Sequence, residues 1–160
     1  MNETLGALRQ AADRLALTHA GVAPLFALTT PTFTALPEGD RERLDAYAIR
    51  YAHCQDLLFP AMRALARAQL EPKADSGFLA LFSLMQKQGI TTDLDDWERQ
   101  RGLRNAVSHE YPDQSAIVDI LNAIWAATPE VLRYVEHLTM RANKIASTGE
   151  SQRGLASEAP

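Results

Sequence analysis

Apolar positions recur at alternating steps of three and four residues along most of this chain. In the first segment they fall at Leu5, Leu8, Ala12, Leu15, His19 and Val22. Such steps place side chains on one face of an α-helix. A helix with one apolar face must bury that face against other elements. The pattern therefore predicts an all-α fold, an up-and-down helical bundle of four to five helices.

Prolines and composition changes mark the expected boundaries of the first two helices. Residues 23–39 contain three prolines and several threonines, which predicts an irregular connection. A connection of this length in a compact domain is often functional or mobile. The second helix is expected to start at Asp40, which is a suitable N-cap. Because Pro60 lies inside its apolar pattern, we expect a kink near residues 55–59.

Three further helices follow in the second half of the chain. A short apolar helix is expected over residues 77–87 and ends at Gly89. A charged helix begins near Asp93, and its early acidic residues suit the positive end of a helix dipole. The last helix is expected over residues 114–143, after Pro112 has interrupted the chain. No internal repeat is visible.

Length and composition fit one soluble domain. The 160 residues are 46% hydrophobic and 22% charged, enough for a single core. Residues 1–145 are expected to form this domain. Residues 146–160 are rich in Ser, Gly and Glu and are expected to be a disordered tail. No uninterrupted apolar run has membrane-spanning length and no signal peptide is visible, so we expect a cytoplasmic protein without membrane association.

Net charge limits the kind of nucleic-acid binding that is possible. The chain carries a formal charge of −4. Proteins that bind long nucleic acids by neutralising phosphates usually present a basic surface. An RNA site in this protein must therefore be a local basic patch or a pocket that contacts few phosphates.

Chemically the most informative stretch is residues 104–111, Arg-Asn-Ala-Val-Ser-His-Glu-Tyr. Arg104 is always cationic and can hold a phosphate with a forked pair of hydrogen bonds. His109 can gain or lose a proton near neutral pH and so act as a general acid or base. Together these residues point to chemistry at a phosphodiester.

This stretch resembles the signature helix of the HEPN superfamily, whose motif is Arg, four to six residues, then His. The form in this chain, Arg104-Asn105 followed by His109 and Tyr111, is similar to that of HEPN proteins that pair with minimal nucleotidyltransferases. A second block, RLDAYAIRY at residues 43–51, resembles a segment on an earlier helix of that family. The two blocks occur in the expected order, and the resemblance covers residues 1–142.

The resemblance implies the ribonuclease toxin of a toxin–antitoxin pair, with RNA and not DNA as its substrate. His109 would transfer protons, Arg104 would stabilise charge on the phosphate, and Asn105 would orient one or both. The partner would be a cognate nucleotidyltransferase antitoxin that attaches AMP to Tyr111. The added negative charge and bulk would then block RNA binding.

A second interpretation is a non-catalytic subunit that binds the substrate or nucleotide of a nucleotidyltransferase. Arg104, Asn105 and His109 would then grip a ligand without cutting it. The acidic net charge favours this interpretation, whereas the complete motif favours the nuclease. A third interpretation is a helical adaptor in which the motif is accidental.

The spacing of Arg104 and His109 favours a homodimer. Residues five apart lie about 140° apart around an ideal helix, so both cannot point into one pocket. Either the helix is distorted near His109, or a second copy of the chain supplies half of the site. The resemblance favours the second explanation, because HEPN domains typically pair with their motif helices facing each other. Symmetric dimers are also the commonest oligomers.

Ordinary structural roles are the alternative for each motif residue. Arg104 would pair with Asp96 or Glu98 on its own helix, His109 would cap carbonyl groups, and Tyr111 would be a half-buried aromatic.

The remaining candidates for chemistry are weak. His19 and His53 are expected to be packing residues, and His137 to lie near a helix C-terminus. Cys54 is expected to be buried. We find neither a metal-ligand spacing nor a glycine-rich phosphate loop, so we expect neither a metal nor a cofactor.

Overall fold

A computed structural model describes the backbone of residues 1–108 and 113–157, and the side chains of residues 1–108 and 113–147. Over this part of the chain the protein contains six α-helices, one short 3-10 turn and no strand, which confirms the predicted all-α bundle, although the sequence predicted only four to five helices. In chain order the elements are α1 (Asn2–Val22), η1 (Ala23–Leu25), α2 (Thr30–Thr34), α3 (Glu38–Ala68), α4 (Phe78–Lys87), α5 (Leu94–Ala106) and α6 (Gln114–Ser157).

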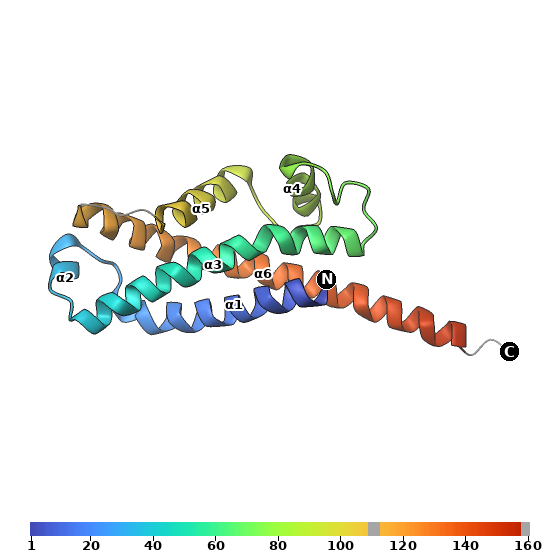
Figure 1. The fold of residues 1–160 in the computed structure, drawn as a ribbon, viewed down its shortest axis with the longest axis horizontal. Coiled ribbons are helices and arrows are strands. Elements are labelled where there is room, and N and C mark those ends of the chain that lie inside the picture. The colour runs from blue at the N-terminus through green and yellow to red at the C-terminus, as the bar shows by residue number, and fades with distance from the viewer. Residues whose placement is uncertain (109–112, 158–160) are drawn as a thin grey trace.

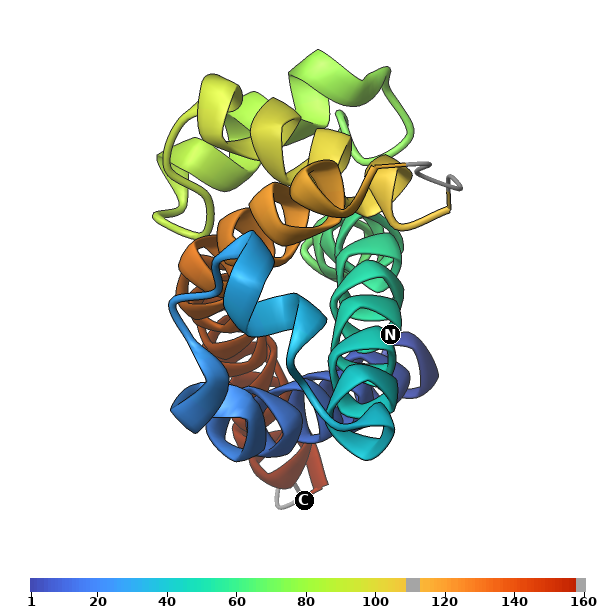
Figure 2. The same cartoon turned by 90° about the vertical axis from the view of Figure 1, so that its left-hand side faces the viewer.

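Three long helices, α1, α3 and α6, form the body of the molecule (Figure 1). Seen from the end, α5 lies across α3 and α6 on the side away from α1 (Figure 2). α4 packs beside α3, and the last turns of α6 extend past the other helices (Figure 1). α5 is therefore held by two long helices from below, while its opposite side faces outward.

A cluster of aromatic and hydroxyl groups joins the three long helices inside the bundle. The Tyr47 hydroxyl lies 2.5 Å from the hydroxyl of Thr128 and 3.0 Å from Nδ1 of His19. The His19 ring stacks on Trp125, with 3.8 Å between ring centroids. Burial raises the pKa of Tyr47 to about 12, so the hydroxyl keeps its proton and can donate it in a hydrogen bond. His19 is thus a packing residue, as predicted.

Among the described side chains, α3 supplies more fully buried ones than any other helix. Its fully buried side chains are Leu44, Tyr47, Tyr51, Cys54, Gln55, Leu58, Ala61, Met62, Leu65 and Ala66. The predicted burial of Cys54 is confirmed, and burial raises the pKa of its thiol to about 12. The thiol therefore stays protonated and contributes packing alone.

Residues 23–39 are more regular than the sequence predicted. They contain η1 and α2, and α2 is started by a capping box. The Thr29 hydroxyl accepts a hydrogen bond from the Thr32 N–H at 3.2 Å, and the Thr32 hydroxyl accepts one from the Thr29 N–H at 2.8 Å. The side-chain amide of Asn122 bonds both backbone groups of Leu28 and ties the segment to α6. A five-residue helix is too short to produce an apolar period, so the sequence pattern missed it.

The last helix runs further than expected. Pro129 lies inside α6 without ending it, just as Pro60 lies inside α3, where the sequence predicted a continuous helix with a kink. We expected a disordered tail from residue 146, whereas α6 continues to Ser157. Residues 146–157 contain no proline and several good helix formers, so their composition is compatible with a helix.

One part of α6, Gln114–Ser147, is long and apolar enough by length and composition to span a membrane, and its most apolar stretch of 18 residues has a mean hydropathy of 1.2. Its apolar side includes Ile124, Val131 and Leu138, which are buried in the bundle core. The central helix of a soluble bundle meets the same criteria, so this helix is compatible with a soluble protein.

Candidate functional site

The helix that leads to the motif, α5, is fixed at its start by a cap and a buried ring. Oδ1 of Asp93 accepts hydrogen bonds from the backbone N–H groups two and three residues later, at 2.7 and 3.3 Å. This confirms the predicted start of the helix. Trp97 is 2% exposed and packs between Phe82 of α4 and Tyr134 of α6, at centroid distances of 5.7 and 6.4 Å. The other end of α5 is thereby held at a defined place over α3.

At that end Arg104 reaches back to Asp56 of α3. Its Nε and Nη2 donate to the two carboxylate oxygens of Asp56, both at 2.7 Å. Arg101, one turn earlier, lies 3.6 Å from the same carboxylate and 3.3 Å from the side-chain oxygen of Gln55. Two guanidinium groups thus share one carboxylate, which leaves one positive charge in excess.

The sequence predicted that Arg104 pairs with Asp96 or Glu98, and this prediction was wrong. Asp96 forms an ion pair with Arg99 within α5, and Arg104 instead pairs across helices with Asp56. Intrahelical pairing would have left the guanidinium on the solvent side of α5. Pairing with Asp56 holds it at the junction of α3 and α5.

The guanidinium of Arg104 retains a second edge for a ligand. The fork to Asp56 uses Nε and one N–H of Nη2, while Nη1 lies 3.3 Å from the side-chain oxygen of Asn105. Remaining N–H groups on Nη1 and Nη2 match the two oxygens of a phosphate. The side chain is 31% exposed, and its hydrogen bonds to Asp56 raise its pKa. Arg104 is therefore a positioned, permanent cation at the surface.

Directly after this cation, α5 ends. The helix stops at Ala106, and the Ser108 N–H donates to the carbonyl of Asn105 at 3.1 Å in a tighter turn. His109 and Tyr111 lie outside the described residues. The angular mismatch assumed a regular helix as far as His109, so it no longer argues by itself for a second copy. The homodimer stays a prediction.

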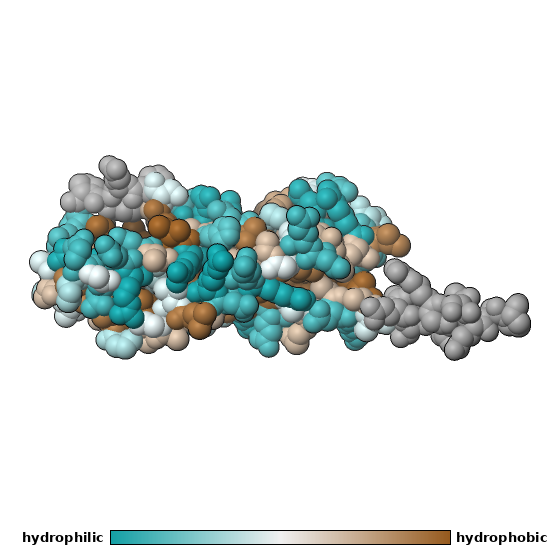
Figure 3. Space-filling model, turned by 60° about the horizontal axis from the view of Figure 1, so that its bottom comes forward, coloured by the Kyte–Doolittle hydropathy of each residue, from teal (hydrophilic) through white to brown (hydrophobic). Residues whose placement is uncertain are grey.

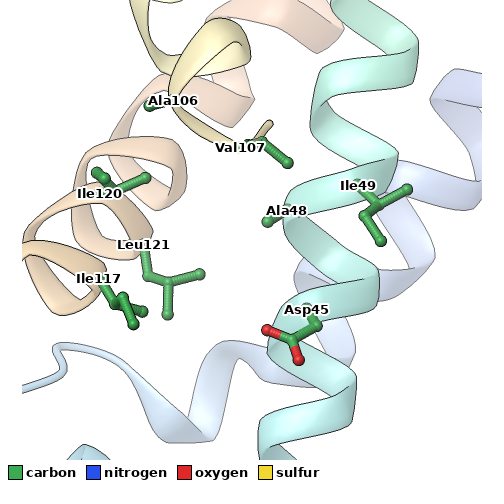
Figure 4. Close-up of a pocket in the computed structure, with 8 residues that line it drawn as sticks. All are labelled: Asp45, Ala48, Ile49, Ala106, Val107, Ile117, Ile120 and Leu121. Carbon is green, nitrogen blue, oxygen red and sulfur yellow. The ribbon is translucent and has the colours of Figure 1, made fainter. Parts of the chain in front are cut away.

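A hollow of about 360 Å³ lies beside the end of α5 (Figure 4). It is bounded by α3, the last residues of α5 and the first turns of α6, and its lining residues are Asp45, Ala48, Ile49, Ala106, Val107, Ile117, Ile120 and Leu121. Within this lining Asp45 is the one polar residue, and its carboxylate points toward the apolar side chains of α6 (Figure 4). The hollow can take a flat apolar group that offers a hydrogen-bond donor.

Two other histidines differ from their predicted roles. His53 was expected to be a packing residue, but it is exposed on α3 and lines a groove beside α1. Its position falls next to the apolar stripe and not in it. His137 lies well inside α6 and not near its end, and its Nδ1 donates to the carbonyl of Gly89 at 2.7 Å. It therefore helps to close the end of α4.

Asp56 and Arg101 were not singled out from the sequence. Asp56 lies 48 positions before Arg104 in the chain, and no local spacing connects it with Arg101 or Arg104. Only the packing of α5 on α3 brings them together.

No family model, curated protein or solved structure matches the chain.

Proposed function

We propose that this protein is a metal-independent ribonuclease of the HEPN type and acts in the cytoplasm as the toxin of a toxin–antitoxin pair. The fork between Arg104 and Asp56 is the observation that supports this most, because it fixes a cation where α5 leads into the motif segment. His109 follows five residues later in the chain. A fixed cation and a nearby proton-transfer group are the main requirements for cleaving RNA without a metal.

In the proposed reaction His109 removes the proton of a ribose 2′-hydroxyl, and the resulting oxygen attacks the adjacent phosphorus. The bond from phosphorus to the 5′-oxygen breaks, and the leaving oxygen takes a proton from the imidazolium. Arg104 stabilises the charge that builds on the non-bridging oxygens, and Asn105 orients the phosphate or His109. The products are a 2′,3′-cyclic phosphate and a 5′-hydroxyl. DNA lacks the nucleophile and is not a substrate.

We further propose that the active form is a homodimer in which two motif segments face one cleft. The outward side of α5 is compatible with such pairing, because α3 and α6 cover its opposite side. One excess positive charge per copy at the Arg101–Asp56–Arg104 cluster gives the cleft a local positive potential in an otherwise acidic protein.

The direct test is cleavage of single-stranded RNA by the purified protein in excess EDTA. We expect cleavage to persist in EDTA and to yield cyclic phosphate ends, because the chemistry needs only side chains. His109→Ala is expected to lower the rate about 10²–10⁴-fold through loss of proton transfer. His137→Ala, which replaces a histidine of α6, is the matched control and should cleave like the wild type.

Two results would count against this mechanism. One is cleavage that stops when EDTA is added, and the other is an unchanged rate in His109→Ala. An intact, folded protein that binds nucleotide but cuts no RNA would support the alternative, a non-catalytic binding subunit of a nucleotidyltransferase.

Tyr111 is the proposed site of silencing by the cognate nucleotidyltransferase. The chain has four tyrosines, and Tyr47, Tyr51 and Tyr134 are fully buried. A modifying enzyme cannot reach those three in the folded protein. Transfer of AMP from ATP would join the phenol oxygen of Tyr111 to the α-phosphorus and release pyrophosphate. The added charge, carried by the same motif as Arg104, would compete with RNA for the cation.

Tyr111→Phe is expected to cleave RNA nearly as fast as the wild type but to resist silencing. The ring is kept and only the acceptor oxygen is removed. Intact-mass spectrometry after incubation with the nucleotidyltransferase and ATP should show an added AMP on the wild type and none on the variant. AMP on a residue other than Tyr111, or equal silencing of both proteins, would show that the assignment is wrong.

A further inference from the structure

A groove with cationic walls runs between α1 and α3, next to the hollow beside α5, and Ile49 lines both. It has a volume of about 410 Å³ and is lined by Ala11, Arg14, Leu17, Ile49, Arg50 and His53. Two of these six side chains are permanent cations, one is a histidine and none is a carboxylate. The chain as a whole has more acidic than basic residues, 20 against 16. The groove is therefore positively charged, whereas the protein as a whole is acidic.

The two arginines of the groove are available to an anionic ligand. Within the described residues, the Arg14 guanidinium has no ion-pair partner, and Arg50 donates to the hydroxyl of Thr18, a neutral acceptor. The next part of the groove, toward the end of α1, contains Arg43 together with Glu42. Arg43 is already paired with an aspartate on its own helix. Uncompensated positive charge is thus concentrated at Arg14 and Arg50.

The groove leads toward the Arg101–Asp56–Arg104 cluster. His53 lines the groove and Asp56 holds the cluster, and the two residues are three apart on α3. Residues three apart are neighbours on a helix surface, and the axial rise between them is about 4.5 Å. A ligand that occupies the groove can therefore extend along α3 to the guanidinium of Arg104.

Apolar side chains accompany the charges. Leu17 and Ile49 also line the groove and are 75% and 62% exposed, so their aliphatic surfaces are open to a ligand. The α1 side of the molecule is mainly hydrophilic, with isolated hydrophobic patches (Figure 3). Two arginines beside exposed aliphatic surface suit a ligand that has both phosphates and less polar sugar or base surfaces.

We propose that the groove between α1 and α3 binds backbone phosphates of an RNA strand next to the phosphate held at Arg104. The identification of the strand as RNA rests on the proposed ribonuclease function. Arg14 and Arg50 each hold a phosphate oxygen, and Leu17 and Ile49 contact the sugar or base between them. Phosphate contacts of this kind position a strand without reading its sequence.

The test is binding of a fluorescent single-stranded oligonucleotide made of 2′-O-methyl RNA, which lacks the nucleophile and cannot be cut. Arg14→Gln/Arg50→Gln is compared with the wild type by fluorescence anisotropy over a range of salt concentrations. We expect the double variant to bind about 10-fold more weakly. The slope of log K against log salt should become shallower by about 0.7 for each phosphate that the variant no longer neutralises.

The matched control is Arg67→Gln/Arg141→Gln, which removes the same charge from positions outside the groove. It should bind like the wild type, and circular dichroism should show that both double variants are folded. Equal loss of affinity in the two variants would mean that only net charge matters and would overturn the proposal. So would equal binding by wild type and the groove variant, or no binding by the wild type.

The same experiment separates this proposal from the ribonuclease. If the protein binds RNA through the groove but cleaves no RNA, the proposed RNA-binding role of the groove stands and the proposed ribonuclease function is wrong. If the protein cleaves RNA but its affinity for the oligonucleotide does not depend on Arg14 and Arg50, the ribonuclease function stands and the proposed role of the groove is wrong. If the double variant binds the oligonucleotide normally but no longer binds the nucleotidyltransferase, the groove is a protein interface and the proposal is wrong.

Discussion

Replacing Arg104 with alanine is expected to lower the rate of RNA cleavage about 10²–10³-fold, the usual effect of removing a group that stabilises transition-state charge. The protein should stay folded. Arg104 and Asp56 are both about one-third exposed, at 31% and 39%, and solvent-screened ion pairs of this kind contribute little to the free energy of unfolding. Cleavage rates and urea denaturation, measured on the same preparation, separate the two effects.

Three further variants show whether the fork geometry matters. Arg104→Lys keeps the charge but cannot hold Asp56 and a phosphate with two parallel bonds, so its rate should fall almost as far. Asp56→Asn keeps the cation but weakens the charge-assisted fork that orients it, and we expect a loss of about 10-fold. Arg99→Ala removes a nearby arginine paired within α5 and should leave the rate unchanged. If the Arg104→Ala variant cleaves RNA at the wild-type rate, Arg104 has no part in the mechanism.

Trp97→Ala is expected to lower the free energy of unfolding by about 3–5 kcal/mol, because it deletes a large buried ring and leaves a cavity. Trp97 is 2% exposed and its ring packs on aromatic residues of α4 and α6. Typical domains are stable by only about 5–15 kcal/mol, so this loss is large. Urea denaturation followed by circular dichroism measures it without relying on tryptophan fluorescence.

The control for Trp97→Ala is Leu79→Ala on α4, where the side chain is 63% exposed. A surface substitution of this kind should change the free energy of unfolding by no more than about 0.5 kcal/mol. A similar small effect for Trp97→Ala would mean that α5 does not depend on this ring for its place over α3. Cleavage by the folded fraction of Trp97→Ala should also fall, since Arg104 lies on the same helix.

The sequence predicted the elements whose signals are local. Apolar periodicity indicated the long helices, Asp93 caps α5 as its position suggested, and Gly89 ends α4. Gly89 has a φ of 70°, and the N–H of Ile90 reaches back to the Met85 carbonyl at 2.9 Å. This closing bond is typical of a glycine-ended helix. Each of these features depends on residues within one or two turns of each other.

The sequence did not predict features that depend on packing between helices. Nothing near Arg104 in the chain indicates Asp56, because the packing of α5 on α3 decides which carboxylate it meets. The exposure of His53 was not predicted for a related reason. His53 lies beside the apolar stripe of its helix, and this position alone does not show whether a neighbouring helix covers the side chain. α3 begins at Glu38 and not at Asp40, a difference of the size expected for helix boundaries.

Pro60 gives α3 a mechanical property at the place where the site is built. A proline has no N–H, so the carbonyl four residues earlier lacks its helical donor. In α3 that carbonyl belongs to Asp56, whose side chain holds Arg104. Helices bend most easily where this bond is missing. Any bending of α3 at this point therefore changes the distance between the Asp56 carboxylate and α5. The same turn of α3 thus determines both the stiffness of the helix and the alignment of the Arg104 guanidinium.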